Sequence, residues 1–285
     1  SHAPARVEDE EGCRPFAPAA RSWTMAKTPS SPPCDFVATH DYWRLSRQPL
    51  MSLVFVAPIL VIYEAGVLVL GPKAVRNGVD VWLRGFLELL DFGNYFLLPV
   101  LVVGILLGWH HTTREPWRVP RGVFWGMAVE CVGLAFFLRL ISHVEAFALS
   151  ALAGSVSGTA KATALAAGAS GKTAGLIAFL GAGVYEELLF RLILFGAMAW
   201  AIRHVVVAGA TATTVAVLAS SAVFAAAHYV GPYGEAIAWH EFSFWYGAIF
   251  RFLAGVFFSM LFIARGFGIA AGAHAGYDIL VRLAC

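Results

Sequence analysis

The chain has 285 residues, of which 59% are hydrophobic and only 13% are charged, and its mean hydropathy is +0.71. Soluble domains carry roughly a quarter charged residues, so this composition excludes an ordinary soluble protein and predicts a polytopic membrane protein. The formal net charge of +2, without any block of like charges, excludes an electrostatic nucleic-acid binder. We therefore expect membrane lipids, and no nucleic acid, among its partners.

Residues 1–48 are polar, carry a cluster of Pro and Ser, and lack the apolar period of a helix. We expect this N-terminal segment to be poorly ordered, and we exclude the residues before Met25, the first methionine, from the fold prediction. Residues 49–285 are predicted to form a single transmembrane helical domain. Its fold class is all-α, because open strands cannot satisfy their backbone hydrogen bonds in lipid.

Apolar runs of about twenty residues are long enough to cross a bilayer as helices. We predict about seven spans, near residues 51–70, 95–109, 123–141, 173–200, 208–229, 244–264 and 267–283. Residues 73–92 instead separate apolar from charged side chains at helical spacing, which predicts an amphipathic helix lying on the membrane interface. Residues 150–172, which are rich in Ala, Gly, Ser and Thr, are predicted to form a loop or a weak helix.

Single charged residues interrupt several of these spans. Glu64, Glu130 and Arg139 are interpreted as structural pairs or interface groups, because unpaired charge within lipid is unfavourable. Arg251, a turn or two into the sixth span, either extends its long stem to the interface or binds a substrate carboxylate or lipid phosphate. We favour the first of these interpretations for Arg251.

The fourth predicted span holds two adjacent carboxylates and an arginine, namely Glu186, Glu187 and Arg191. A charge at bilayer depth costs roughly 2.5–3.5 kcal/mol on insertion scales, so it should be paired, solvated or functional. Glu187 and Arg191 are four residues apart with the acid first, the favourable order for an ion pair on one helix face. Glu186 points about 100° away from Glu187. We therefore predict that Arg191 neutralises Glu187 while Glu186 remains free to handle a proton.

Two later spans add histidines at helical spacing. His228 follows Phe224 by four residues, and His274 precedes Asp278 by four, so each pair shares a helix face. A glutamate can act as general base on water, and a histidine can help hold that water or pass a proton to the leaving group. A second histidine with a polar neighbour can donate to a developing oxyanion. Together these groups could hydrolyse an amide in or beside the membrane.

Each of these groups also has a purely structural interpretation. Glu187 and Arg191 alone are equally consistent with a structural ion pair. An isolated His228 at a helix end is more often an interfacial side chain, and His274 with Asp278 could form a local hydrogen bond. Their joint occurrence in three late spans favours one shared site.

In order and spacing, Glu186-Glu187-x-x-x-Arg191, Phe224-x-x-x-His228 and His274-x-x-x-Asp278 resemble the three motifs of the CPBP intramembrane proteases. This family groups CaaX prenyl endopeptidases with bacterial Abi proteins, and the resemblance covers roughly residues 120–283. It implies a membrane helix bundle that encloses a polar cavity, with its protease core in those residues. It also implies a non-covalent glutamic endopeptidase, without cofactor or metal, that acts on a peptide or protein substrate, lipidated or not. We expect an integral protein of a bacterial cytoplasmic membrane.

Carried over by position, the resemblance makes Glu186 the base that activates water, with His228 helping to hold that water. Glu187 and Arg191 would support the site electrostatically, and His274 with the residue at position 278, here Asp278, would form the oxyanion site.

The last motif position departs from the commonest family pattern, which has Asn where this chain has Asp278. A carboxylate is a poor oxyanion donor unless it is protonated. An alternative role for Asp278 is to orient His274 by accepting its ring N–H, as carboxylates do around metal-bound histidines.

Two other classes of function remain open from the residues alone. Two histidines and a glutamate are a common set of catalytic zinc ligands, although the H-E-x-x-H helix motif is absent. A transporter, channel or non-enzymatic immunity scaffold could use the same polar residues as a proton or ion path. Inverted repeats would favour a transporter, and none is recognisable in the sequence.

Overall fold

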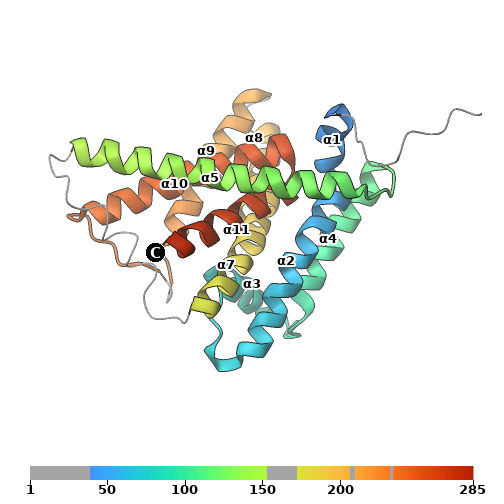
Figure 1. Cartoon of the computed structure of the whole chain (residues 1–285), viewed down its shortest axis with the longest axis horizontal. Helices are drawn as coiled ribbons and strands as arrows, with labels where there is room; N and C mark the ends of the chain where they lie inside the picture. The colour runs from blue at the N-terminus through green and yellow to red at the C-terminus, as the bar shows by residue number, and fades with distance from the viewer. Residues whose placement is uncertain (1–38, 153–171, 206–208, 232–233, 285) are drawn as a thin grey trace, which may run out of the picture. The chain divides into compact units, whose positions relative to one another are not determined.

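The computed structural model describes residues 39–152, 172–205, 209–231 and 234–284, and every regular element within these ranges is helical (Figure 1). The α-helices are α1 (Thr39–Ser46), α2 (Pro49–Leu70), α3 (Gly78–Leu89), α4 (Leu97–Thr113), α5 (Arg121–Leu152), α7 (Lys172–Glu187), α8 (Gly196–Val205), α9 (Ala210–Ala227), α10 (Phe242–Arg265) and α11 (Phe267–Ala284). A 3-10 turn, η1 (Gly71–Lys73), follows α2, and a π-helical segment, η2 (Leu188–Phe195), joins α7 to α8. The predicted all-α class is therefore confirmed.

The helical chain begins earlier than the predicted domain boundary at residue 49. Thr39–Ser46 forms α1, and its Tyr42 donates a hydrogen bond to Glu130 of α5. This contact joins residues far apart in the chain, so the local composition of the N-terminal segment could not reveal it. Residues 1–38 and most of the predicted loop at 150–172 lie outside the described residues.

By length and composition, four segments of the described chain could cross a membrane: Pro49–Lys73, Arg121–Leu152, Ala210–Ala227 and Phe242–Arg265. The chain is therefore a polytopic helical membrane protein. The other three predicted spans fall on α4, which is a shorter apolar helix, on α7 with η2 and α8, and on α11. The last two carry the charged motif residues, and the total of about seven spans stays a prediction.

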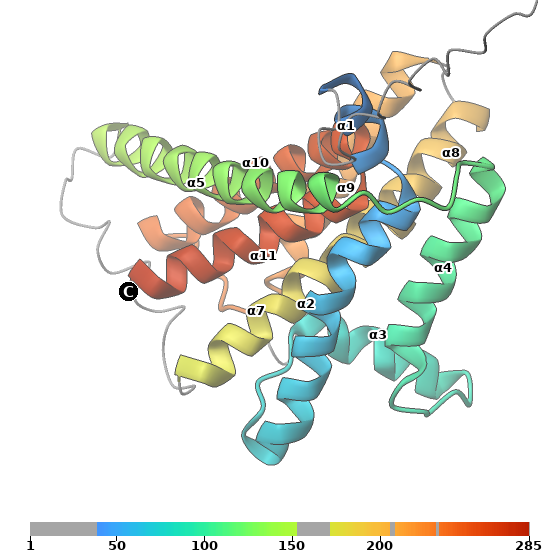
Figure 2. The same cartoon turned by 45° about the vertical axis from the view of Figure 1, so that its right-hand side comes forward.

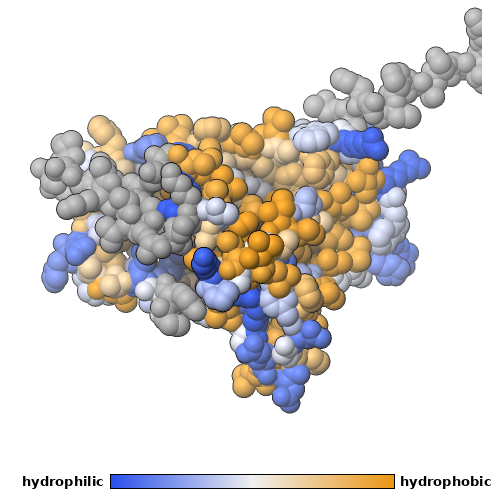
Figure 3. All heavy atoms as spheres, turned by 60° about the horizontal axis from the view of Figure 1, so that its bottom comes forward, coloured by the Kyte–Doolittle hydropathy of each residue, from blue (hydrophilic) through white to orange (hydrophobic). Residues whose placement is uncertain are grey.

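Large hydrophobic side chains remain exposed on these helices, as a surface in contact with lipid requires. Figure 3 shows hydrophobic residues spread over much of one face of the molecule. Strongly exposed examples on α2 and α5 are Val61, Val69, Val129 and Phe147. Soluble monomers rarely expose contiguous apolar surface on this scale.

Helix α11 packs against both α5 and α7, as two views show (Figures 1 and 2). It buries small residues, among them Ala271 and Ala275. A Cβ added to Gly183 of α7 would lie 2.6 Å from the Ala275 Cβ and 2.8 Å from the Ala271 carbonyl oxygen. Glycine at position 183 therefore permits a close approach of the two helices. This approach brings the carboxylates that follow on α7 up to the histidine of α11.

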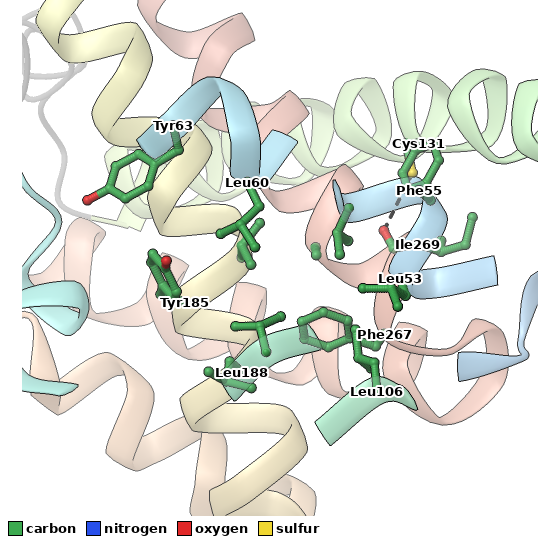
Figure 4. Packing of buried hydrophobic residues seen from close by; sticks show 14 of the residues in the cluster. Leu53, Phe55, Leu60, Tyr63, Leu106, Cys131, Tyr185, Leu188, Phe267 and Ile269 are labelled. Atoms are coloured by element: carbon green, nitrogen blue, oxygen red, sulfur yellow. Dashed lines mark hydrogen bonds between the residues drawn. The ribbon is translucent and has the colours of Figure 1, made fainter. Parts of the chain in front are cut away.

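An apolar cluster drawn chiefly from α2, α4, α5 and α11 receives the buried side chains of α7 and so sets the rotation of α7 about its axis (Figure 4). Within it, the rings of Tyr63 and Tyr185 meet edge to face, with centroids 5.6 Å apart. Leu188, almost one turn after Tyr185, is also fully buried in this cluster. Residues on a helix advance by about 100° each, so Glu186 and Glu187 point away from the cluster on its two sides.

The predicted amphipathic helix within residues 73–92 is confirmed as α3, and ion pairs attach it to α2. Arg84 of α3 lies 2.6 Å from Asp80 on the same helix and 2.9 Å from Glu64 of α2. Of the two interpretations of Glu64 and Glu130, structural pairs or interface groups, the contacts support the first. Arg84 pairs with Glu64, and Arg265 donates to both oxygens of Glu130, at 2.6 and 2.7 Å.

Candidate active site

Glu187 and Arg191 form the predicted ion pair, with Arg191 Nη1 3.0 Å from Glu187 Oε1. Both residues are almost completely buried, at 0% and 1% exposed. The Arg191 guanidinium also lies 4.2 Å from the ring centroid of Phe224 on α9 and 5.3 Å from that of Phe258 on α10. Buried cation–π contacts of this kind favour the charged arginine. The pair therefore joins the start of η2 to α9 and α10.

His274 of α11 lies between the two adjacent glutamates. Its Nδ1 is 2.8 Å from Glu187 Oε1, and its Nε2 is 3.7 Å from Glu186 Oε2. The imidazole stacks on the Phe258 ring, with centroids 4.5 Å apart and an interplanar angle of 15°. An ionised carboxylate can only accept a hydrogen bond, so the Nδ1–H of His274 donates to Glu187. The Nε2 side of the ring then faces Glu186.

This geometry corrects the alternative role considered for Asp278. The Asp278 Oδ2 lies 3.7 Å from His274 Nε2, beyond hydrogen-bonding distance. The group that orients the ring is Glu187, which contacts both Arg191 and His274 through one oxygen. Spacing along α11 allowed Asp278 as a local partner, whereas the close packing of α7 on α11 supplies Glu187 as a nearer one from another helix.

The two oxygens of Glu186 have different surroundings. Oε1 accepts a hydrogen bond from Asn77 Nδ2 at 2.8 Å. Oε2 is buried and has no hydrogen-bond partner among the described residues. A buried carboxylate oxygen without a donor is unfavourable unless the site uses it. Glu187 Oε2 also lacks a partner among the described residues, but Oε1 of Glu187 contacts both Arg191 and His274, whereas Glu186 contacts no arginine in the described part of the site.

His228 lies next to this group rather than within it. As the C-terminal cap of α9, its Nδ1 lies 2.9 Å from the Phe224 carbonyl oxygen, which leaves Nε2 as the nitrogen available for other work. The Phe224 ring centroid is 5.0 Å from that of His228 and 6.2 Å from that of His274. The structure therefore brings Glu186, Glu187, Arg191, His274 and Asp278 together, with His228 beyond Phe224.

Arg251 differs from the prediction that it reaches out to the interface. Its side chain is only 18% exposed, pairs with Glu235, and donates to the Tyr229 hydroxyl at 3.0 Å. Tyr229 directly follows His228 in the chain, so this cation lies close to the candidate site. The loop between α9 and α10, which holds Glu235, supplies the partner that the helix pattern could not reveal.

Three contributors to the site were missed by the sequence analysis. Phe258 supports the His274 ring, Tyr185 joins α7 to the ion pairs of α3, and Asn77 bonds Glu186. Only Asn77 left a local signal, because Asn before Gly78 at the start of an amphipathic helix is typical of an N-cap. Within the described residues, no group of three His, Cys, Asp or Glu side chains is arranged to hold a metal ion.

Comparison with known families adds independent evidence. Residues 170–280, which contain every motif residue discussed above, match the family model for Type II CAAX prenyl endopeptidase Rce1-like proteins. No curated protein and no solved structure matches the chain.

Proposed function

Because this polytopic membrane chain carries a domain of the CAAX prenyl endopeptidase family over residues 170–280, we propose that it is an intramembrane endopeptidase in which Glu186 activates water. One observation carries the choice of base. Glu186 Oε2 is buried, lacks a hydrogen-bond partner among the described residues, and lies 3.7 Å from His274 Nε2. Glu187 Oε2 lacks a partner as well, but Oε1 of Glu187 is shared by Arg191 and His274. This acid is therefore held in an ion pair, and Glu186 is the one left to take a proton.

In the proposed reaction, Glu186 Oε2 removes a proton from water as the oxygen attacks the carbonyl carbon of the scissile amide. The carbonyl oxygen becomes an oxyanion that accepts a hydrogen bond from His274 Nε2–H. His274 can donate there while Nδ1–H stays on Glu187 only if the imidazole is doubly protonated. Three nearby carboxylates and the stacked Phe258 ring favour that cation.

Breakdown of the tetrahedral intermediate requires a proton on the leaving amine. Glu186 holds the proton taken from water and can return it to this amine. His228, whose Nδ1–H is donated to the Phe224 carbonyl oxygen, presents Nε2 as an acceptor that can help hold the water. The carbon–nitrogen bond then breaks, and a carboxylate and an amine leave. Asp278 is proposed to stabilise the protonated His274 from the side opposite Glu187, rather than to bind the oxyanion.

A peptide or protein substrate follows from the family, and its finer nature is a proposal. The family is described by its action as a CAAX prenyl endopeptidase, so a prenylated C-terminal peptide is the first substrate to offer. The same peptide without its lipid is the matched control. Arg251, held by the exposed Glu235 beside Tyr229, is a cation that could receive an acidic group of such a peptide.

The test is a cleavage assay with purified, detergent-solubilised protein and both peptides, with and without chelator. We expect new peptide termini from the wild type, none from Glu186→Ala or the isosteric Glu186→Gln, and no loss on chelation. Loss on chelation that added zinc restores would replace this mechanism with a zinc-dependent one. Cleavage retained by both Glu186 variants would mean that another group is the base. If the folded wild type cuts neither peptide, proton-linked transport becomes the function to test.

A further inference from the structure

The side-chain amide of Asn77 forms a hydrogen bond at each end and so links two helices. Asn77 is the N-cap of α3, with its Oδ1 accepting a hydrogen bond from the Val79 backbone N–H at 2.8 Å. Its Nδ2 donates to Glu186 Oε1, also at 2.8 Å, across 109 positions of sequence. One end of the amide therefore fixes the start of α3, and the other end holds a carboxylate oxygen on α7.

Ion pairs hold α3 where this second hydrogen bond can form. Asp80 is fully buried and accepts hydrogen bonds from Tyr63 of α2 at 2.8 Å and from Arg84 at 2.6 Å. Glu64 of α2 accepts from both Arg84 and Tyr185. Tyr185 immediately precedes Glu186, so the network fixes both α3 and the backbone of α7 on either side of the Asn77–Glu186 bond.

We propose that Asn77 is a positioning residue for Glu186. This inference rests on the proposed function, in which Glu186 is the base. A carboxylate can rotate about its terminal torsion, and a strong hydrogen bond to one oxygen removes that freedom. With Oε1 held by Asn77, Oε2 is the oxygen directed toward His274 and toward the water that it must deprotonate. A general base that is misplaced by about 1 Å can lose roughly 100-fold in reaction rate.

Capping alone is a competing explanation, and the two roles of Asn77 can be separated. Asn, Asp and Ser are similarly good N-caps, because each presents an oxygen to the first backbone N–H groups. An ionised Asp has no hydrogen to donate to Glu186, and Ser is too short to place a donor where Nδ2 lies. Asn77→Asp and Asn77→Ser therefore keep the helix cap and remove the hydrogen bond to the base.

The experiment measures kcat, KM and thermal unfolding of the full chain in detergent, for the wild type, Glu186→Gln, Asn77→Asp and Asn77→Ser. Asn94→Asp serves as the control for added negative charge, because Asn94 is exposed and lies just beyond α3. We expect both Asn77 variants to remain folded, with a lower unfolding temperature because Glu186 Oε1 loses its donor, to lose roughly 100-fold in kcat, and to keep KM. Asn94→Asp should behave as the wild type.

The outcomes separate this inference from the proposed function. Cleavage that survives in Glu186→Gln refutes Glu186 as the base and the role of Asn77 with it. Cleavage that is lost in Glu186→Gln but unchanged in both Asn77 variants refutes the positioning role alone and leaves a helix cap. A raised KM with unchanged kcat overturns it too, because Asn77 would then contact substrate instead of setting the base.

Discussion

Two groups of buried charge in this molecule are built from similar residues and differ in how completely they are satisfied. Near α1, both oxygens of Glu130 are bonded by Arg265, whose guanidinium carbon also lies 3.8 Å from the ring centroid of Trp43. In the candidate site, three carboxylates gather around one histidine and one arginine. There, Glu186 Oε2 and Glu187 Oε2 are buried without hydrogen-bond partners among the described residues.

The difference separates a structural role from a chemical one. An acid whose two oxygens are both bonded by a partner arginine is already satisfied, and its contribution is to hold α1, α5 and α10 together. An unsatisfied buried acceptor costs roughly 1–3 kcal/mol. Two of them beside one histidine are unfavourable for folding, and in the proposed function water or substrate supplies the missing partner. The comparison predicts opposite effects for the same substitution in the two groups.

The largest contrast is expected between Glu186→Gln and Glu130→Gln. Glu186→Gln should lower kcat by roughly 10²–10⁴-fold, the range for general base catalysis, with little change in unfolding temperature. Glu130→Gln should leave kcat nearly unchanged and destabilise the fold. This variant removes the counter-charge of Arg265. The expected loss in free energy of unfolding is near the lower end of roughly 3–5 kcal/mol, because Glu130 is partly exposed. Peptide cleavage and thermal unfolding, measured on the same samples, show whether each variant loses activity or stability. If each variant lost both properties, the distinction between the two groups would be wrong.

Glu187 has a structural role, as the partner of Arg191, and a proposed chemical role, as the acceptor for His274, and its substitution should affect both stability and activity. Glu187→Gln leaves Arg191 buried without a counter-charge and weakens the acceptor for His274, so stability and kcat should both fall. Adding Arg191→Met removes the stranded charge and should restore much of the lost stability, since apolar replacements of buried pairs are often tolerated. Activity should not return, because the ring of His274 still lacks its carboxylate.

The control for that double variant is Arg191→Met alone, which strands Glu187 in place of the arginine and should be less stable than the double variant. Thermal unfolding and cleavage of all three variants complete the cycle. Recovery of activity in the double variant would show that Glu187 serves the ion pair only, and that His274 is oriented by another group.

The helices could be predicted because their signals are local. Apolar runs placed α9, α10 and α11 within a few residues of their observed ends, and the spacing of Glu187 and Arg191 predicted their ion pair. The site itself depends on contacts between distant segments. Asn77 reaches Glu186 across 109 positions, and no periodicity within a helix can express that contact.

The errors in the sequence analysis share a cause with these omissions. Local spacing suggested Asp278 as an alternative partner to orient His274, and a helical position near the interface favoured an outward Arg251. In the folded chain, Glu187 and Glu235 provide the carboxylates instead, each from a separate segment brought close by packing. The predicted catalytic roles of the motif residues remain predictions that the variants described here test.

The smallest effect is expected at Asp278. Its carboxylate is 21% exposed and lies 3.7 Å from His274, so it makes no short bond that a neutral amide would break. Asp278→Asn should therefore change kcat by less than about tenfold, or 1.4 kcal/mol in the barrier, and should change stability little. The amide can donate a hydrogen bond where the carboxylate cannot, so a rise in kcat would identify residue 278 as an oxyanion donor in the variant. A loss of kcat as large as that of Glu186→Gln would instead show that Asp278 takes part in proton transfer, so that the site would use two catalytic carboxylates.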